Sequence, residues 1–337
     1  MKILKFLSVA VLSLMLTISA YADPVKVGFV YVGPTGDHGW TYMHDIGRQA
    51  IVKELGDQVE TTYVENVKYG PDAERVMRQM ALQGVDIIFA TSFGYMESML
   101  NVAKEFPDVK FEHATGYKTA ENMSVYSSKF YEGRYVQGVI AGHMSKTGKA
   151  CYIASFPIPE VIRGINAFYL GASSVNPDFD IDVVWVNTWY DPGKEADAAK
   201  VLIAQGADII TQHTDSPAAL QVADAAGVKA FGQASDMIMF APNTQLTAIL
   251  DLWGPYYVER VKAVIDGTWE MQDTWGGMDT GMVAMAPYTN MPDDIKKIAM
   301  ALEKDILEGK FEIFPGASVG DLLGMSEYVE GIDAIKP

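Results

Sequence analysis

Short apolar and β-branched runs alternate along the chain with longer segments that carry a helical pattern. Residues 25–32 (VKVGFVYV) form a continuous apolar run, which is typical of a strand buried on both faces. The pattern then predicts, in chain order, helix 41–55, strand 59–65, helix 71–83, strand 85–90, helix 95–105 and strand 109–114. Strands that alternate with helices of this length indicate βαβ units and a parallel sheet covered on both sides.

The same order returns in the second half of the chain. It predicts, in turn, strand 150–155, helix 159–175, strand 181–187, helix 192–205, strand 208–212, helix 216–227 and strand 229–232. Residues 84–90 (GVDIIFA) and 206–212 (GADIITQ) are similar and occupy equivalent places. The sequence therefore predicts two α/β lobes of common ancestry. The change between them falls near 128–148, where Gly138 and Gly142 suit a closely packed helix.

The pattern changes after the second lobe, with a predicted strand at 246–250, a helix at 254–267 and a Met-rich run at 278–286. If these segments return to the first lobe, several strands join the lobes as a hinge and a ligand would bind in the cleft at the strand ends. We therefore predict an α/β fold with two doubly wound parallel-sheet lobes and a multi-strand hinge. The predicted lobes are 23–128 plus 245–286 and 129–244 plus 287–337.

The first 22 residues have the pattern of a signal peptide. Lys2 and Lys5 precede the apolar stretch 6–19, and Ala20-Tyr21-Ala22 forms an A-x-A cleavage site. A membrane anchor is the alternative, but the apolar run is shorter than the ~20 residues that a span requires. We predict cleavage after Ala22 and a periplasmic protein.

Charge and cysteine content narrow the function classes. Acidic residues outnumber basic ones by 43 to 26, and the formal net charge is −17. A nucleic-acid binder needs the opposite balance, so no nucleic-acid partner is predicted. The lone Cys151 cannot form an internal disulfide, and its apolar surroundings predict a buried strand position.

Aromatic and short polar side chains follow the predicted strands, where the cleft should lie. These candidates are Asp37, Trp40, Ser92, Phe93, Tyr117, Trp189, His213, Thr214, Asp215 and Asp236. Such a lining suits a flat, polar, uncharged ring, because ring faces stack on aromatics while ring edges exchange hydrogen bonds.

Each candidate also has a structural explanation. Trp40 could staple the start of a helix, and Trp189 could close the core behind its strand. Helix capping could account for Asp37, Asp191, Asp215 and Ser235. We favour capping for Asp191, which Pro192 follows, and ligand contact for Asp215 and Asp236.

The sequence gives little support to catalysis, and no cofactor or metal is predicted. The five histidines have no metal-ligand spacing, and both the phosphate-binding glycine motifs and G-x-S-x-G are absent. His213 and Asp215 could form half of an acid–base pair, but no nucleophile accompanies them.

Several segments together resemble the basic membrane protein family, the solute-binding proteins of ABC importers related to the purine-nucleoside receptor of spirochaetes. The similar segments are 27–40, ending in Gly39-Trp40, 131–142 (YEGRYVQGVIAG), 163–168 (RGINAF) with Gly171, 191–194 (DPGK) and 206–210 (GADII). The resemblance implies a type I periplasmic-binding-protein fold with three hinge strands, a purine ligand and an ABC-transporter permease as partner. We expect a monomer.

In the nucleoside binders of that family, an aromatic residue of the first loop stacks on the base, and Trp40 has this position here. An Asp after the last strand of the second lobe holds the ribose hydroxyls, which corresponds to Asp236. The chain departs from the family at the Asn of Asp-x-x-Phe-Asn and at the first Asp of G-x-D-x-D. Because Trp189, Trp253 and Trp275 could fill the remaining space, we predict a bare base in place of a nucleoside.

Adenine is our first choice of base. Asp215 could accept a hydrogen bond from its amine, and Ser92 or Thr214 could donate to ring nitrogens. Hypoxanthine, guanine and xanthine would need a donor, which His213 could supply. A nucleoside binder of the same family, a ligand-sensing regulator and a secreted purine-processing enzyme are the alternatives. Contact of the ligand with Glu160, Arg163 or Tyr117 is left open.

Overall fold

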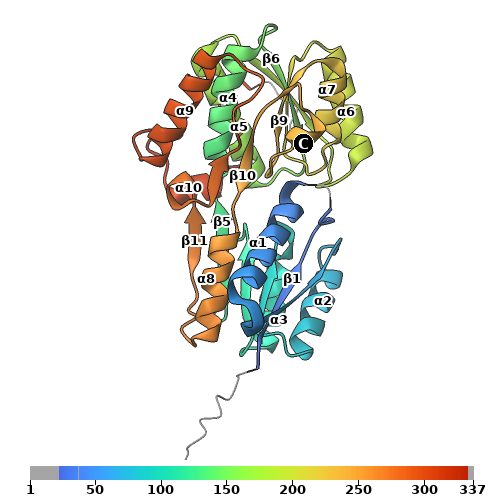
Figure 1. Ribbon diagram of the computed structural model, residues 1–337, viewed down its shortest axis with the longest axis vertical. Coiled ribbons are helices and arrows are strands. Elements are labelled where there is room, and N and C mark those ends of the chain that lie inside the picture. Colours follow the sequence, from blue (N-terminus) through green and yellow to red (C-terminus); the bar gives the residue numbers. More distant parts are fainter. Residues whose placement is uncertain (1–22, 37, 333–337) are drawn as a thin grey trace, which may run out of the picture.

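The computed structural model describes residues 23–36 and 38–332, which form two α/β lobes placed one above the other in Figure 1. The first lobe holds a six-stranded sheet of order β11-β5-β4-β3-β1-β2. Its strands are β1 (Val25–Val30), β2 (Val59–Val64), β3 (Ile87–Ala90), β4 (Lys110–Ala114), β5 (Met123–Ser128) and β11 (Asp273–Gly276). The predicted signal peptide, residues 1–22, lies outside the described residues.

The second lobe holds another six-stranded sheet, of order β12-β10-β9-β8-β6-β7. Its strands are β6 (Lys149–Ala154), β7 (Asp180–Trp185), β8 (Ile209–Gln212), β9 (Lys229–Gly232), β10 (Gln245–Asp251) and β12 (Val283–Met285). All pairings are parallel except that of β10 with β12. Cys151 is buried in β6, as the sequence predicts.

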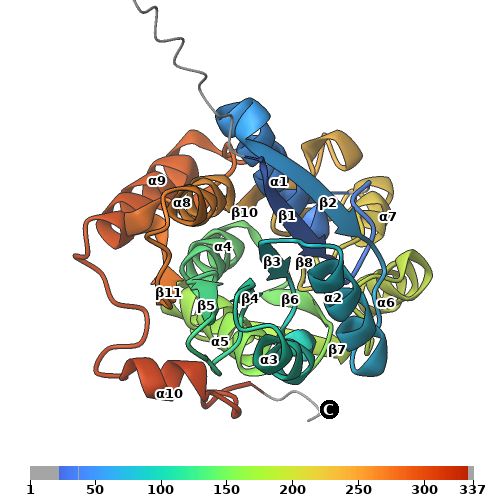
Figure 2. The same ribbon diagram turned by 90° about the horizontal axis from the view of Figure 1, so that it is seen from below.

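Helices cover both faces of each sheet. In the first lobe α1 (Gly39–Leu55) and α8 (Gly254–Ile265) pack on one face, and α2 (Pro71–Leu82) and α3 (Met96–Glu105) on the other (Figure 2). In the second lobe α4 (Tyr131–Met144), α5 (Pro159–Val175) and α9 (Asp293–Leu307) cover one face. The other face carries α6 (Pro192–Ala204) and α7 (Ala218–Ala226), and a short α10 (Val319–Leu323) lies beside the lobe junction in Figure 1. No helix of the described chain has the length and apolarity needed to cross a membrane.

Strand order confirms the internal repeat. Strands β2-β1-β3-β4-β5 of the first lobe and β7-β6-β8-β9-β10 of the second follow the same spatial sequence. In this doubly wound order the connections change direction between β1 and β3, and again between β6 and β8. Ligands of such sheets bind outside the carboxyl ends of the strands at this switch point. The fold therefore places two switch points opposite each other across the cleft.

The chain passes between the sheets after β5, after β10 and between β11 and β12. These crossing segments form the hinge that the sequence led us to expect. The lobe boundaries differ from the expected ones, because β10 and β12 pair within the second sheet, although both fall inside 245–286. The repeat explains the difference, since β10 is the counterpart of β5 and each is the last repeated strand of its own lobe. Figure 1 shows the chain reaching the first lobe only at α8.

Small residues allow α4 and α5 to pack closely, as the sequence predicts for 128–148. A Cβ added at Gly138 would lie 2.0 Å from the Phe168 carbonyl oxygen, and one at Gly171 would lie 2.3 Å from that of Tyr135. Backbone contacts so close leave no room for a side chain. The two helices therefore pack with their backbones in close contact on one face of the second sheet.

Candidate functional site

A pocket lies between the lobes at the two switch points. The closed cleft leaves a cavity of only about 20 Å³, and the empty space in and around it, open solvent included, is about 340 Å³. The lining residues come from both lobes and are Val32, Trp40, Ser92, Phe93, Thr115, Ile158, Glu160, Trp189, His213, Asp215 and Gln233. All of them lie in the loops that follow strands or at the first residues of the helices that come next.

Each lobe supplies one tryptophan to the pocket. Trp40 is the second residue of α1, where its indole nitrogen donates to the Thr91 carbonyl oxygen at 2.6 Å. The buried Trp253 supports it edge-on from behind, with ring centroids 5.4 Å apart. Trp189, on the other lobe, packs against Phe156 at 5.4 Å. Two indoles on opposite lobes suit a flat ring held between them.

Polar groups at the pocket are held in fixed orientations. Arg134 is fully buried and donates to the Thr211 hydroxyl at 2.9 Å and to the Gln233 side-chain oxygen. Because that amide oxygen faces the guanidinium, the Gln233 NH₂ group is left as a donor for the pocket. The Ser92 hydroxyl shares a 2.7 Å hydrogen bond with the Tyr69 hydroxyl.

Buried carboxyl groups gather on the second-lobe side. Burial raises the pKa of Asp215 to about 8, with a further contribution from Glu195. Burial also raises the pKa values of Glu160 and Glu195 to about 7, although Arg163 and Arg134 act against this at Glu160. Asp215 is therefore largely a neutral carboxylic acid near pH 7, able to donate as well as accept.

His213 stands between the acidic and aromatic parts of the pocket. Its Nε2 lies 3.9 Å from Glu160 Oε1. Burial, together with Arg134 and Arg163, holds the His213 pKa well below its usual range. The ring is therefore neutral at physiological pH and offers one donor and one acceptor.

Backbone N–H groups at the start of α1 connect the lobes across the cleft. Gly39 N–H donates to the Ser235 hydroxyl at 2.8 Å, and Trp40 N–H donates to Asp215 Oδ1 at 3.3 Å. Both donors are free N–H groups of the first turn of α1, which intrahelical bonding cannot satisfy. The structure is therefore a closed form in which the start of α1 contacts the second lobe.

Backbone conformations of positive φ surround the cleft. They occur at the non-glycine residues His38, Asn66, Thr115, Asn187 and Ala234, with φ between 52° and 64°. For β-branched Thr115, which lines the pocket, this conformation is a genuine outlier. Such strain typically persists at functional sites, where the surrounding structure enforces it.

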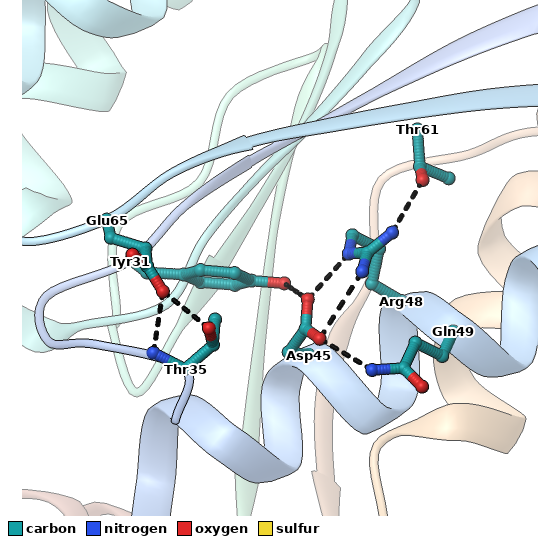
Figure 3. A network of polar contacts seen from close by, with 7 residues as sticks. All are labelled: Tyr31, Thr35, Asp45, Arg48, Gln49, Thr61 and Glu65. Atoms are coloured by element: carbon teal, nitrogen blue, oxygen red, sulfur yellow. Dashed lines mark hydrogen bonds and ion pairs between the residues drawn. The ribbon is translucent and has the colours of Figure 1, made fainter. Parts of the chain in front are cut away.

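A polar network holds the loop that precedes Trp40. Asp45 of α1 accepts from Tyr31 Oη at 3.3 Å and from Arg48 Nε at 2.6 Å (Figure 3). In the loop itself, Thr35 N–H donates to Glu65 Oε1 at 2.7 Å. These contacts fix both the loop and α1 to the edge of the sheet, and so position Trp40.

The structure brings together six of the predicted site residues, which line the pocket: Trp40, Ser92, Phe93, Trp189, His213 and Asp215. The other described candidates lie elsewhere. Tyr117 borders a neighbouring hollow, Thr214 is buried beside the pocket and Trp253 belongs to the first-lobe core. Asp236 is outside the lining, and its Oδ1 accepts from Ile238 N–H and from Gln245 Nε2. Asp37 lies outside the described residues.

The structure shows which of the residues that could cap a helix do so. Asp191 caps α6 by accepting from Lys194 N–H, as expected. Ser235 and Asp215 instead accept across the cleft from the start of α1.

Sequence reasoning missed Val32, Thr115, Ile158 and Gln233, and left Glu160 open. Gln233 and Thr115 both directly follow predicted strands, so their positions could have indicated them. Among the described residues, no group of three or more His, Cys, Asp or Glu side chains could hold a metal ion.

The carboxyl groups predict a dependence of stability on pH. When the folded-state pKa of a carboxyl group lies above its unfolded-state pKa, the folded protein binds more protons between these two values. The free energy of unfolding therefore falls as pH rises from the unfolded-state pKa to the folded-state pKa. The interval runs from about 4 to about 8 for Asp215 and from about 4.5 to about 7 for Glu160 and Glu195. We expect a lower melting temperature at about pH 8.5 than at about pH 5. Asp215→Asn, which stays neutral, should reduce this difference; an unchanged difference would contradict the role of Asp215.

Comparison with known proteins agrees with this geometry. The family model described as "ABC transporter substrate-binding protein PnrA-like" matches residues 24–313. The chain belongs to this family. It is thus a substrate-binding protein of an ABC transporter, in a family of solute-binding proteins and not of enzymes.

Two relatives match this chain over most of its length and most of their own. A purine-binding protein of Brucella abortus (strain 2308) is 60% identical over 331 residues, which span 94% of this chain and 95% of the relative. A Haloferax volcanii protein, provisionally named an ABC transporter glucose-binding protein, is 40% identical over 94% of this chain and 82% of its own.

Solved structures agree on the fold. A solute-binding protein from Aeropyrum pernix K1 has a TM-score of 0.76 at 18% identity and covers 89% of this chain and 95% of its own. One from Conexibacter woesei has a TM-score of 0.69 at 23% identity, with coverage of 86% and 98%. They support the periplasmic-binding-protein architecture expected from the sequence.

Proposed function

We propose that the protein captures a purine nucleobase, adenine before the others, between Trp40 and Trp189 and delivers it to an ABC-transporter permease. The observation that carries this proposal is the pair of indoles that the two lobes bring to one pocket. The 60% identity to a purine-binding protein supports the ligand class.

Asp215 provides a reason to favour adenine. Its Oδ1 already accepts from Trp40 N–H, and its raised pKa leaves a proton for the other oxygen. A protonated carboxyl can donate to a ring nitrogen of adenine while accepting from the adjacent amine, as an amide side chain would. Gln233 NH₂ then serves a second ring nitrogen. Guanine and hypoxanthine could pair with the same carboxyl only with their carbonyl at the place of the adenine ring nitrogen and their ring N–H at the place of the amine, which shifts the base in the pocket.

Calorimetric titration of the ligand-free protein with adenine, hypoxanthine, guanine, adenosine and glucose tests the proposal. We expect adenine to bind at least about tenfold more tightly than glucose, a difference of about 1.4 kcal/mol. A nucleoside that binds more than about tenfold tighter than every free base would reverse the preference for a base.

Two alternatives have their own outcomes in these experiments. The Haloferax relative makes glucose the second candidate, and tighter binding of glucose than of any purine would favour it. Incubation with purine nucleosides followed by chromatography would reveal turnover if the protein processed them. Unchanged nucleosides are expected, since we propose binding without catalysis and without a cofactor.

We also propose that the protein works in the periplasm as a monomer. Export would remove residues 1–22, so the mature chain should begin at Asp23. N-terminal sequencing of the periplasmic protein, with light scattering to give its mass, tests both statements. A mature chain that retains residues 1–22, or a dimeric mass, would contradict them.

A further inference from the structure

Trp189 and Asp215 lie on two loops of the second lobe that come from strands which are not neighbours. Trp189 follows β7 and Asp215 follows β8, and β6 lies between these strands in the sheet. Backbone pairing in the sheet fixes the strands but not the loops that extend beyond them. Because both residues line the pocket, other contacts must set the distance between them.

Glu195, in the first turns of α6, bridges the two loops. Its Oε1 accepts from Asp191 N–H at 2.9 Å. Its Oε2 accepts from Ser216 N–H at 3.1 Å and from the Ser216 hydroxyl at 2.7 Å. The side chain is fully buried. Each carboxyl oxygen thus holds a different loop, the first shortly after Trp189 and the second directly after Asp215.

Further hydrogen bonds complete the connection between the loops. Asp215 N–H donates to the Trp189 carbonyl oxygen at 2.9 Å. Within the second loop, Gln212 Nε2 donates to the carbonyl oxygens of Thr214 and Ser216, both at 2.8 Å. The turn that carries Asp215 is therefore held as one unit, so a displacement of Ser216 would move Asp215 with it.

Helix capping explains only part of the role of Glu195. A carboxylate near the start of a helix can accept from the N–H of the N-cap residue, as Glu195 does from Asp191. Capping does not account for the two hydrogen bonds from Ser216, which lies on another loop. The bonds to Ser216 are the ones that connect the start of α6 with the pocket.

We propose that Glu195 is a positioning residue for purine binding, which holds Trp189 and Asp215 at the spacing that one base requires. This inference rests on the proposed purine-binding function. Glu195 is not among the residues that line the pocket, so it acts on the ligand through Trp189 and Asp215. It keeps the ring face of the one and the hydrogen-bonding edge of the other in place before the base arrives, which lowers the cost of ordering them on binding.

The charge of Glu195 makes this role measurable by pH. The Asp215 pKa is raised to about 8 by burial first and by Glu195 second, while the Trp40 N–H opposes both. The other titratable groups that interact with Asp215 are Glu160 of α5, Asp251 of β10 and the Tyr69 hydroxyl. Removal of the Glu195 charge should lower the Asp215 pKa. In the proposed binding mode adenine accepts the Asp215 proton, so its affinity should then be lost at a lower pH.

Calorimetric titration with adenine from about pH 6 to about pH 9 tests the proposal on two variants. Glu195→Gln keeps the size of the side chain, but its NH₂ group would face an N–H donor of one loop, so that link is lost. We expect adenine to bind about tenfold more weakly at about pH 6.5, and the affinity to be half lost at a lower pH than in the wild type. Glu195→Asp keeps the charge but is too short to reach both loops. It should lose a similar affinity while the pH of half loss stays close to that of the wild type.

Asp208→Asn is the matched control, because Asp208 also holds a loop but at the opposite end of β8. Its carboxylate accepts from the Ser145 hydroxyl at 2.5 Å and from the N–H groups of Lys146 and Thr147 at 2.7 and 3.1 Å. Asp208→Asn should lower stability but keep adenine affinity within about twofold at every pH. If Glu195→Gln has the same affinity and the same pH dependence as Asp208→Asn, the proposal is overturned.

The remaining outcomes separate this inference from the proposed function. If the wild type binds no purine, the proposed function itself is wrong. If the wild type binds adenine and Glu195→Gln binds it equally well, only the role of Glu195 is wrong. Ser216→Ala is a milder variant in case Glu195→Gln does not fold. It removes one of the three hydrogen bonds and should weaken adenine binding by about threefold, and unchanged affinity would overturn the proposal.

Discussion

Gly39→Ala should weaken purine binding by on the order of a hundredfold, because it prevents the cleft from closing. A Cβ at this position would lie 2.5 Å from the Asp215 carbonyl oxygen on the opposite lobe. Closure would then lose the two hydrogen bonds of Gly39 and Trp40, each worth about 1 kcal/mol, and the indoles could not approach each other fully. Calorimetry gives the affinity, and small-angle scattering with and without adenine reports closure.

The control must separate this clash from backbone strain, since Gly39 has a φ of +82°. Gly70→Ala is the matched control. Gly70 directly precedes α2 and has a positive φ of +75°, as Gly39 at the start of α1 does, but nothing lies within 4 Å of a Cβ added at Gly70. Both variants should lose about 1 kcal/mol of stability, but only Gly39→Ala should lose affinity. Equal affinity in the two variants would refute the role of Gly39 in closure.

Trp40→Ala should weaken binding by about 1–3 kcal/mol, which corresponds to between about fivefold and a hundredfold in the dissociation constant. The indole is expected to stack on the purine from the first lobe, while Trp253 keeps it in place from behind. Calorimetric titration with adenine measures the effect.

Two companion variants show whether the affinity lost in Trp40→Ala comes from the aromatic face of Trp40. Trp40→Phe keeps an aromatic face but removes the hydrogen bond to Thr91, so it should retain most of the affinity. Trp269→Ala removes a tryptophan outside the pocket, one that donates to Glu112 at 2.7 Å, and should lower stability without changing affinity. If Trp40→Ala binds adenine as the wild type does, Trp40 has only a core role.

The sequence predicts the strands and the residues at their ends well, because these depend on local patterns. Buried parallel strands are continuous apolar runs, and the residue after such a run must emerge at the carboxyl edge. That rule is enough to place Trp40, Ser92 and His213 around one pocket, as the structure does.

Features that depend on distant partners were harder to predict. The pattern of β10 identifies a strand but cannot tell which sheet it joins, since pairing with β9 is decided by the tertiary fold. Asp236 also follows a strand, yet it bonds within its own turn to Ile238 and to Gln245 at the start of β10. Trp253 faces the first-lobe core because the chain crosses the hinge just before it. The turn at Asp236 is a local contact, whereas the sheet chosen by β10 and the position of Trp253 leave no local signature.

The division of the pocket between two equivalent switch points has a consequence for release. With the lobes apart, the first lobe would hold a bound ring only by Trp40, and the second lobe only by Trp189 and Asp215. Neither lobe alone would then make all the contacts that hold the ring. If purine binds as proposed, a permease that separates the lobes would need no competing group to expel it. In the proposed binding mode, separation at the hinge would release the ring and would return the N–H groups of Gly39 and Trp40 to water.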